Sequence, residues 1–256
     1  MDLSKKVAII TGGASGIGAC CVEEFLKNNI KAVIIADIGN GENFAQELNK
    51  KYGSGRALFV KTDVTDQASF ENTFKTTIEH YNNVDILVNC AGLIDEVNWR
   101  KMYHVNLFGP VIGCELAIKY LPKYKSDAKT YIINIASVLG MIPYAAGTNY
   151  SASKHAIVGL TRCYGMNKTL AKQGICIMAL CPGRTATPFD DCYDASKIVY
   201  TECIEEVTDN FVLQKPDVVG KSAIEILGKG KTGSVWVIDV GELFEKHLPT
   251  YETLRN

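Results

Sequence analysis

Tyr150 and Lys154 bring a phenol and an ammonium group within one turn of a predicted helix. Residues four apart lie on the same helix face, and a nearby positive charge favours the ionised phenolate. At about 5 Å and an effective dielectric of about 20, the attraction between the ammonium and the phenolate is about 3 kcal/mol. Lowering the pKa of a tyrosine from about 10 to about 7 needs about 4 kcal/mol, so this attraction supplies most of it. The pair therefore predicts a general base, Tyr150, which Lys154 tunes for work near neutral pH.

Ser137 is the polar residue expected to act beside Tyr150. It follows a predicted strand, at the carboxyl edge where open α/β sheets bind ligands, and it precedes Tyr150 by 13 residues. We expect its hydroxyl to hydrogen-bond a substrate oxygen and the alkoxide that develops from it. Tyr164 and Tyr193 also precede a lysine by four residues. Ser151, at the same offset from Tyr164, would lie about 20 Å away along one helix, and Leu180 stands at that offset from Tyr193. Tyr150 is therefore the predicted catalytic tyrosine.

A glycine-rich loop, residues 11–18 (TGGASGIG), follows the first predicted strand and opens a helix. Such a loop offers backbone N–H groups to a pyrophosphate with no side chain in the way. Asp37 ends the second predicted strand, where a carboxylate accepts hydrogen bonds from both ribose hydroxyls and repels a 2′-phosphate. No Arg or Lys lies in the loop or in the three residues after Asp37, so the predicted cofactor is NAD rather than NADP. The expected contacts in the loop are Gly12, Ser15, Gly16, Ile17 and Gly18.

Short β-branched runs alternate with helical patterns along the chain. Because most of these runs lack polar alternation, they fit a parallel sheet that is covered on both faces. The sequence predicts one α/β domain over residues 1–256, a Rossmann fold with a doubly wound, seven-stranded parallel sheet and helices on both faces. The expected strands are Val7–Thr11, Ala32–Asp37, Ala57–Val60, Asp85–Asn89, Tyr131–Ile135, Ile175–Leu180 and Val235–Val240.

Two further segments stand outside this alternation. Residues 184–214 form a long irregular stretch, which in a single domain is typical of a functional lid. Its apolar side chains are expected either to wall a substrate site or to anchor an ordinary surface loop; they are Phe189, Tyr193, Ile198, Val199 and Tyr200. Residues after about 241 are expected to form a C-terminal tail.

Composition excludes several classes of protein. The 256 residues carry a net charge of −1, with no run of five like charges, which argues against a nucleic-acid partner. No stretch approaches 18 apolar residues, so no membrane span is expected. Nine cysteines without a Cys-x-x-Cys pair indicate reduced thiols and a cytoplasmic location. The four histidines have no metal-ligand spacing, so no metal is expected.

Seven motifs in order resemble those of the short-chain dehydrogenase/reductase family over nearly the whole chain. They are the loop at 11–18, Asp63-Val64, Asn89-Cys90-Ala91-Gly92, Asn106, Ser137, Tyr150 with Lys154, and Pro182-Gly183. The resemblance implies that Lys154 also holds ribose hydroxyls, that Thr187 holds the nicotinamide carboxamide, and that Asn106 anchors a water in a proton relay. A buried asparagine in a helix more commonly satisfies backbone groups, so that alternative stays open for Asn106. The remaining cofactor contacts implied are Asp63, Val64, Asn89, Ala91, Tyr150, Pro182, Gly183 and Thr185.

The same resemblance implies oxidation of a secondary alcohol to a ketone, with the reverse reduction, and a homodimer or homotetramer packed through residues 107–121 and 156–164. Residues 98–101 resemble the 15-hydroxyprostaglandin dehydrogenases, and residues 1–3 and 233–241 the insect type of alcohol dehydrogenase. Prostaglandin dehydrogenases have a glutamine where this chain has Gly147, which predicts a roomier, less polar pocket and an apolar alcohol such as a hydroxylated lipid, isoprenoid or steroid.

Three alternatives to this function stay open: a catalytically silent NAD-binding regulatory protein, a 15-hydroxyprostaglandin dehydrogenase proper, and a serine hydrolase that pairs Ser137 with His155. The hydrolase lacks the Gly-x-Ser-x-Gly elbow, because Ile135 and Leu139 stand at the glycine positions.

Overall fold

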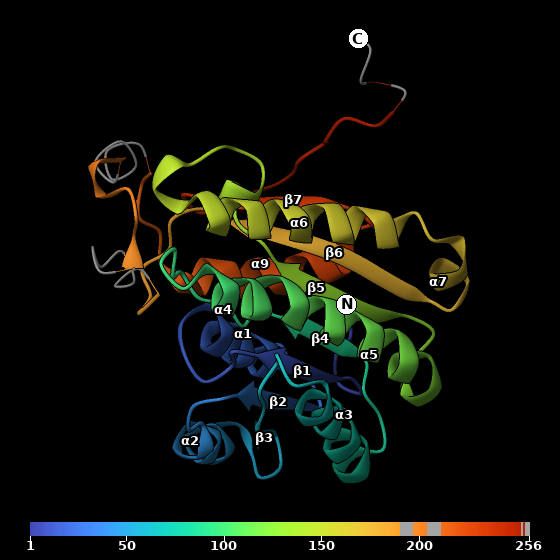
Figure 1. Cartoon of the computed structure of the whole chain (residues 1–256). Coiled ribbons are helices and arrows are strands. Elements are labelled where there is room, and N and C mark those ends of the chain that lie inside the picture. Colours follow the sequence, from blue (N-terminus) through green and yellow to red (C-terminus); the bar gives the residue numbers. More distant parts are fainter. Residues whose placement is uncertain (190–196, 204–210, 252, 254–256) are drawn as a thin grey trace.

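The strands of the computed structural model, which describes residues 1–189, 197–203, 211–251 and 253, form one sheet in the order β3-β2-β1-β4-β5-β6-β7-β8 (Figure 1). All neighbours from β3 to β7 pair in parallel. The predicted parallel sheet is therefore confirmed, with strand ends within two residues of those expected. The bounds are β1 Val7–Thr11, β2 Ala32–Asp37, β3 Ala57–Lys61, β4 Ile86–Asn89, β5 Thr130–Ile135, β6 Ile175–Pro182, β7 Val235–Asp239 and β8 Glu242–Glu245.

The eighth strand, β8, lies in the segment expected to be tail. It pairs antiparallel with β7, with Asp239 opposite Glu242. The two residues between them, Val240 and Gly241, both have positive φ, at 48° and 81°. Such a two-residue turn matches the right-handed twist of the strands that it joins. The sheet thus has one antiparallel edge strand more than the sequence predicted.

Helices cover both faces of the sheet, and alternate strand residues supply the two cores. In β1, Ala8 and Ile10 pack with α1, α2 and α9, while Val7 and Ile9 pack with α3 and α5 on the other face. Most positions of the central strands are therefore apolar, which is why the runs lack polar alternation. The bounds of the main helices are α1 Gly16–Lys27, α2 Glu42–Tyr52, α3 Gln67–Tyr81, α4 Trp99–Tyr103, α5 Gly109–Tyr124, α6 Thr148–Gly165, α7 Lys168–Lys172 and α9 Pro216–Lys229.

Short helical turns complete the described elements. A π-helical turn, η1 (His104–Phe108), joins α4 to α5. Three 3-10 turns are η2 (Val138–Gly140), η3 (Ala145–Gly147) and η6 (Thr201–Cys203). Among the described residues, no helix is long and apolar enough to cross a membrane.

The sheet order reverses between β1 and β4, so the loops after these strands lead to opposite sides and leave a crevice at their carboxyl ends. Open α/β sheets bind ligands at such a point. The glycine loop leaves β1 there, and residues 90–93 leave β4 beside it. Thr11 joins the two ends, because its Oγ1 accepts hydrogen bonds from the backbone N–H groups of Cys90 (3.0 Å) and Ala91 (3.1 Å).

The base of the predicted lid is tied to the sheet. Thr185 and Gln214 form a parallel bridge, so the two ends of the segment 184–214 lie side by side. The buried Gln214 side chain donates to the carbonyl of Ile238 (3.0 Å) and to Thr185 Oγ1 (3.2 Å). Tyr193 lies outside the described residues. That the segment 184–214 acts as a lid stays a prediction.

Candidate active site

A groove runs along the carboxyl ends of β1, β2 and β4. The glycine loop forms one wall, and the backbone explains its glycines. Gly12 has φ +63°, and a Cβ on it would lie 2.9 Å from Ala91 Cα. A Cβ on Gly18 would lie 2.0 Å from the carbonyl oxygen of Gly12. Only glycine at these two positions lets the loop lie close to β4 and to the first turn of α1.

The first turn of α1 faces this groove. Its N-cap, Ser15, is exposed, and the Ser15 side chain makes no capping hydrogen bond. The 12-residue helix therefore presents backbone N–H groups that its own cap does not occupy. Together with the open backbone at Gly16, this end of the helix fits a pyrophosphate.

Asp37 lies at the carboxyl end of β2, on the same groove. Its Oδ2 accepts a hydrogen bond from the N–H of Ala14 (3.0 Å), and its Oδ1 accepts one from Gly39 (2.9 Å). A carboxylate has about four acceptor positions, so two remain for ribose hydroxyls. The carboxylate is thus fixed in place by the loop that would hold the pyrophosphate.

Most of the predicted cofactor residues line this groove. They are Gly12, Ser15, Gly16, Ile17, Gly18, Asp37, Asp63, Val64, Ala91, Tyr150, Lys154 and Thr187. Pro182, Gly183 and Thr185 line a second, adjoining cavity instead. Lys101, to which the sequence assigned no role, also lines the groove.

Asn89 lines neither space, because its side chain lies in the core. Its Nδ2 donates to Asn134 Oδ1 (2.9 Å), and Asn134 Nδ2 donates to Thr161 Oγ1 (2.9 Å). All three residues are buried. This chain of hydrogen bonds joins β4 and β5 to α6, the helix that carries Tyr150 and Lys154.

Lys154 lies on α6 and is 6% exposed. Its Nζ donates to the carbonyl of Ile135 (3.0 Å) and lies 5.6 Å from the centre of the Tyr150 ring. Burial lowers the pKa of Lys154 from 10.5 to about 8. An ammonium has three donors, so two remain for other groups after the bond to Ile135. The predicted phenol and ammonium are therefore brought together, with the amine charged below about pH 8.

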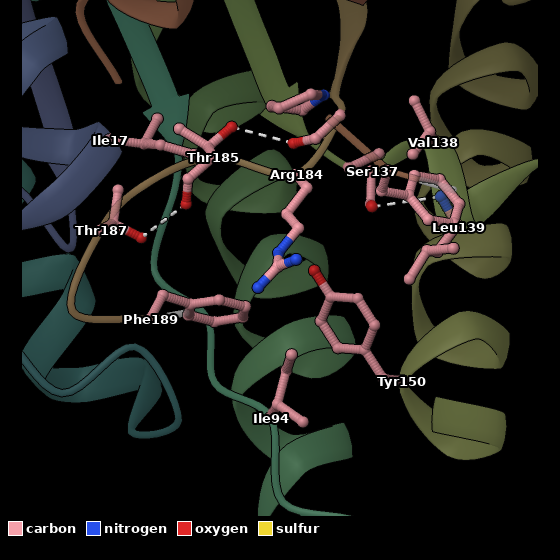
Figure 2. Close-up of a pocket in the computed structure, with 14 residues that line it drawn as sticks. Ile17, Ile94, Ser137, Val138, Leu139, Tyr150, Arg184, Thr185, Thr187 and Phe189 are labelled. Atoms are coloured by element: carbon pink, nitrogen blue, oxygen red, sulfur yellow. Dashed lines mark hydrogen bonds between the residues drawn. The ribbon is translucent and has the colours of Figure 1, made fainter. Parts of the chain in front are cut away.

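Ser137 and Tyr150 line the second cavity (Figure 2). Ser137 Oγ accepts a hydrogen bond from the N–H of Leu139 (3.1 Å), so the serine also caps η2. That bond uses a lone pair, and the hydroxyl proton can still be donated into the cavity. Tyr150 lines both spaces, so a substrate in the cavity and a cofactor in the groove would meet at its ring.

Asn106 is in the π-helical turn η1 and is 1% exposed. Its Oδ1 accepts from the N–H of Leu93 (2.9 Å), and its Nδ2 donates to the carbonyl of Leu93 (2.8 Å). The side chain therefore fixes the loop after β4, as in the backbone-satisfying alternative. Its place in a proton relay stays a prediction.

Glu96 is a residue of the site that sequence reasoning missed. It is 4% exposed and lies on the loop after β4. Its Oε1 accepts from the N–H of Tyr150 (2.7 Å), and its Oε2 accepts from the N–H (3.0 Å) and Nδ2 (2.8 Å) of Asn149. The carboxylate thus caps the N-terminus of α6, where its charge suits the helix dipole. Its 54-residue separation from Tyr150 left no local signal in the sequence.

Apolar side chains form most of the remaining cavity wall, and one basic side chain enters it. Ile94, Leu139, Phe189 and Phe211 are apolar lining residues. The Phe189 ring lies 6.0 Å from that of Tyr150. The basic side chain is Arg184, which extends between Phe189 and Tyr150 in Figure 2.

Two expectations about the wall were wrong. Val199 and Tyr200 are more than half exposed and line neither space, although Ile198 is buried beside Tyr150. The extra room expected at Gly147 is also missing, because a Cβ there would lie 2.9 Å from the ring of Tyr144. The Tyr144 ring already fills that space.

The hydrolase alternative does not fit this arrangement. His155 is exposed and its Nδ1 is 2.9 Å from the carbonyl oxygen of Ser151, whereas Ser137 is buried in the cavity. In the described part of the chain, no three His, Cys, Asp or Glu side chains are grouped as a metal site would need. The eight described cysteines are free thiols.

A parallel sheet with a glycine loop at its switch point defines a nucleotide-binding α/β protein. Comparison with known proteins identifies its family: the profile of the short chain dehydrogenases matches residues 6–197. A 15-hydroxyprostaglandin dehydrogenase (NAD(+)) of Rattus norvegicus is 31% identical over 233 residues, 89% of this chain and 88% of its own. The protein of that name in Homo sapiens is 30% identical over the same length. Alcohol dehydrogenase 2 of Ceratitis cosyra is 26% identical over 251 residues, 98% of this chain and 97% of its own. The chain belongs to the short-chain dehydrogenase family.

Proposed function

We propose that this protein oxidises a secondary alcohol to a ketone with NAD, and catalyses the reverse reduction. The observation that carries the proposal is the position of Tyr150. Its ring lies between the groove that fits a dinucleotide and the cavity that Ser137 lines. Lys154, buried in the groove, places its amine beside that ring. A base, an oxygen-binding donor and a cofactor site thus converge, as alcohol oxidation requires.

In the proposed reaction, Ser137 donates a hydrogen bond to the substrate oxygen and orients it toward Tyr150. Tyr150, as the phenolate, accepts the proton of the substrate hydroxyl group while a hydride leaves the carbon that carries this group. Lys154 stabilises that phenolate by its positive charge. Bound NAD supplies the acceptor of the hydride. Ser137 then continues to stabilise partial negative charge on the oxygen until the ketone forms.

One feature of the cofactor site and one similarity to known proteins support NAD over NADP. Asp37 already accepts bonds from the loop and adds a negative charge where a 2′-phosphate would lie. The prostaglandin dehydrogenases to which the chain is similar are named for NAD(+) as well.

A silent NAD-binding protein would not need the intact group of Ser137, Tyr150 and Lys154.

The cavity wall supports an alcohol with an apolar body, such as a hydroxylated lipid, isoprenoid or steroid. Ile94, Leu139, Phe189 and Phe211 offer it apolar contacts. A 15-hydroxyprostaglandin belongs to the same panel, because the relatives carry that name. The argument from Gly147 against prostaglandins fails, since the Tyr144 ring occupies the space concerned. The cytoplasmic location and the homo-oligomer stay predictions.

The experiment compares Tyr150→Phe with a matched control on the same helix, Tyr164→Phe. Tyr164 hydrogen-bonds Glu115 through its hydroxyl and lines neither the groove nor the cavity. Each variant is assayed with NAD and a panel of secondary alcohols, by absorbance of the reduced cofactor. Tyr150→Phe should lose about 100-fold or more of kcat, as expected for a general base, while Tyr164→Phe keeps it. If Tyr150→Phe retains the full rate on an alcohol that the wild type oxidises, Tyr150 is not the base.

A further inference from the structure

Lys101 is an exposed lysine of the cofactor groove that the proposed reaction does not use. It lies on α4 and lines the groove together with Val105, which is four residues later on the same helical face. Within the described part of the chain, no side chain or carbonyl pairs with the Lys101 ammonium. Its three donors are therefore available to a ligand that occupies the groove.

Neighbouring residues hold the backbone of α4 in place. Met102, the next residue, is fully buried, and its Sδ accepts a hydrogen bond from the N–H of Asp95 (3.4 Å). Asp95 Oδ1 in turn accepts one from the N–H of Asn98 (2.8 Å), the N-cap of α4. The Lys101 side chain thus extends from a fixed backbone. Binding a ligand then orders only the side chain, which limits the entropy that is lost.

The charges of the groove show why Lys101 matters to an anionic ligand. The charged side chains among its described lining residues are Asp37, Asp63, Lys101 and Lys154. Lys154 is buried, and its amine lies beside the Tyr150 ring. Without Lys101, the two carboxylates would outnumber this one amine, and the groove would repel an anion. Lys101 balances the charges and adds a cation that solvent can reach.

The chemistry of NAD identifies the group that this cation attracts. The pyrophosphate is the anionic part of the cofactor, with one negative charge on each phosphate at neutral pH. The adenine and the two riboses are neutral, and the oxidised nicotinamide ring is positive. A lysine ammonium binds phosphate oxygens as a compact point charge. The first turn of α1 offers the equivalent of only about half a positive charge, so a second source of positive charge is favourable.

We propose that Lys101 binds the pyrophosphate of the cofactor, in addition to the first turn of α1. The proposal rests on the NAD site of the proposed function and adds a residue to that site. Because the Lys101 side chain is exposed, salt should screen its charge and weaken its contribution. The contribution should not depend on the nicotinamide, because the pyrophosphate is a separate part of the cofactor.

The test measures cofactor affinity by calorimetric titration in the absence of substrate. The ligands are NAD and ADP-ribose, which has the pyrophosphate but lacks the nicotinamide. Lys101→Met should weaken the binding of both by about fivefold to tenfold at low salt, as expected for a charged hydrogen bond at an exposed site. Added salt should reduce this factor. Lys101→Arg keeps the charge and should restore most of the affinity.

The matched control is Arg100→Met, which removes a positive charge from the adjacent residue. The Arg100 guanidinium lies 4.1 Å from the centre of the Trp99 ring, and Arg100 lines neither the groove nor the cavity. This variant should change both affinities by less than about twofold. If Lys101→Met binds NAD and ADP-ribose no more weakly than Arg100→Met, Lys101 does not bind the pyrophosphate, while the proposed function stands. A loss for NAD that is absent for ADP-ribose would also overturn the proposal. If the wild type binds neither ligand, the NAD site of the proposed function is itself wrong.

Discussion

Replacing Lys154 by methionine should make the fold more stable at neutral pH while it stops turnover. Methionine keeps an unbranched side chain of similar length but removes the charge. The charge is unfavourable for folding, because burial lowers the pKa of Lys154 from 10.5 to about 8. The unfolded chain therefore binds the proton more tightly than the folded one. Keeping this residue for catalysis is expected to cost stability, as is common at active sites.

The size of the effect follows from the two pKa values. Below about pH 8 the difference between them amounts to about 3 kcal/mol of lost stability. Above about pH 10.5 both states are neutral and this loss disappears, so the wild type gains stability as pH rises between these limits. Against it stands the hydrogen bond from Lys154 to the carbonyl of Ile135, whose loss costs about 1–2 kcal/mol at any pH. At about pH 7, Lys154→Met should therefore be more stable by about 1–2 kcal/mol.

Urea unfolding of both proteins, without cofactor, at about pH 7 and about pH 9.5 separates the two contributions. The hydrogen-bond contribution is the same at both pH values and cancels when they are compared. From about pH 7 to about pH 9.5, the free energy of unfolding of the wild type should therefore rise by about 2 kcal/mol relative to that of Lys154→Met. Burial raises the pKa of the neighbouring Cys90 and Cys181 thiols to about 12, so both stay neutral in the folded proteins. Their ionisation in the unfolded chain is common to the wild type and Lys154→Met and cancels in the comparison. A stability difference that is the same at both pH values would show that Lys154 is not buried as a costly ammonium.

Three further predictions concern other parts of the site and its assembly. Asp37→Ser should reduce the preference for NAD over NADP by at least about tenfold in kcat/KM, because it removes the charge that repels a 2′-phosphate; an unchanged preference would contradict the role of Asp37. Glu96→Gln should lower the free energy of unfolding by about 1–3 kcal/mol and reduce kcat more than KM, because the amide presents a donor to N–H groups of α6. Urea unfolding measures the free energy and steady-state kinetics measure kcat and KM, and unchanged values would refute the capping role. Light scattering should give a particle of at least twice 28.0 kDa at micromolar concentration, and a monomer would rule out the predicted oligomer.

The positions of the strands and the main elements of the site follow from local sequence. Apolar runs without polar alternation require burial on both faces, so the parallel sheet could be predicted from them. The glycine loop and Tyr150 with Lys154 are short-range patterns whose geometry depends on one turn or one helix. Asp37 could be placed because the end of a strand beside the loop is a fixed position in this topology. Each of these predictions needed only neighbouring residues and the rules of the parallel sheet.

Other features depend on contacts between distant segments, which no local pattern reports. Glu96 caps α6 across 54 residues, and Asn89 turns into a hydrogen-bonded chain in the core rather than toward the groove. The ring of Tyr144 fills the space that the sequence predicted at Gly147. Arg184 enters an apolar cavity because Gln214, 30 residues later, ties its backbone to the sheet. Packing density and buried hydrogen bonds decide such positions, and both are properties of the assembled fold.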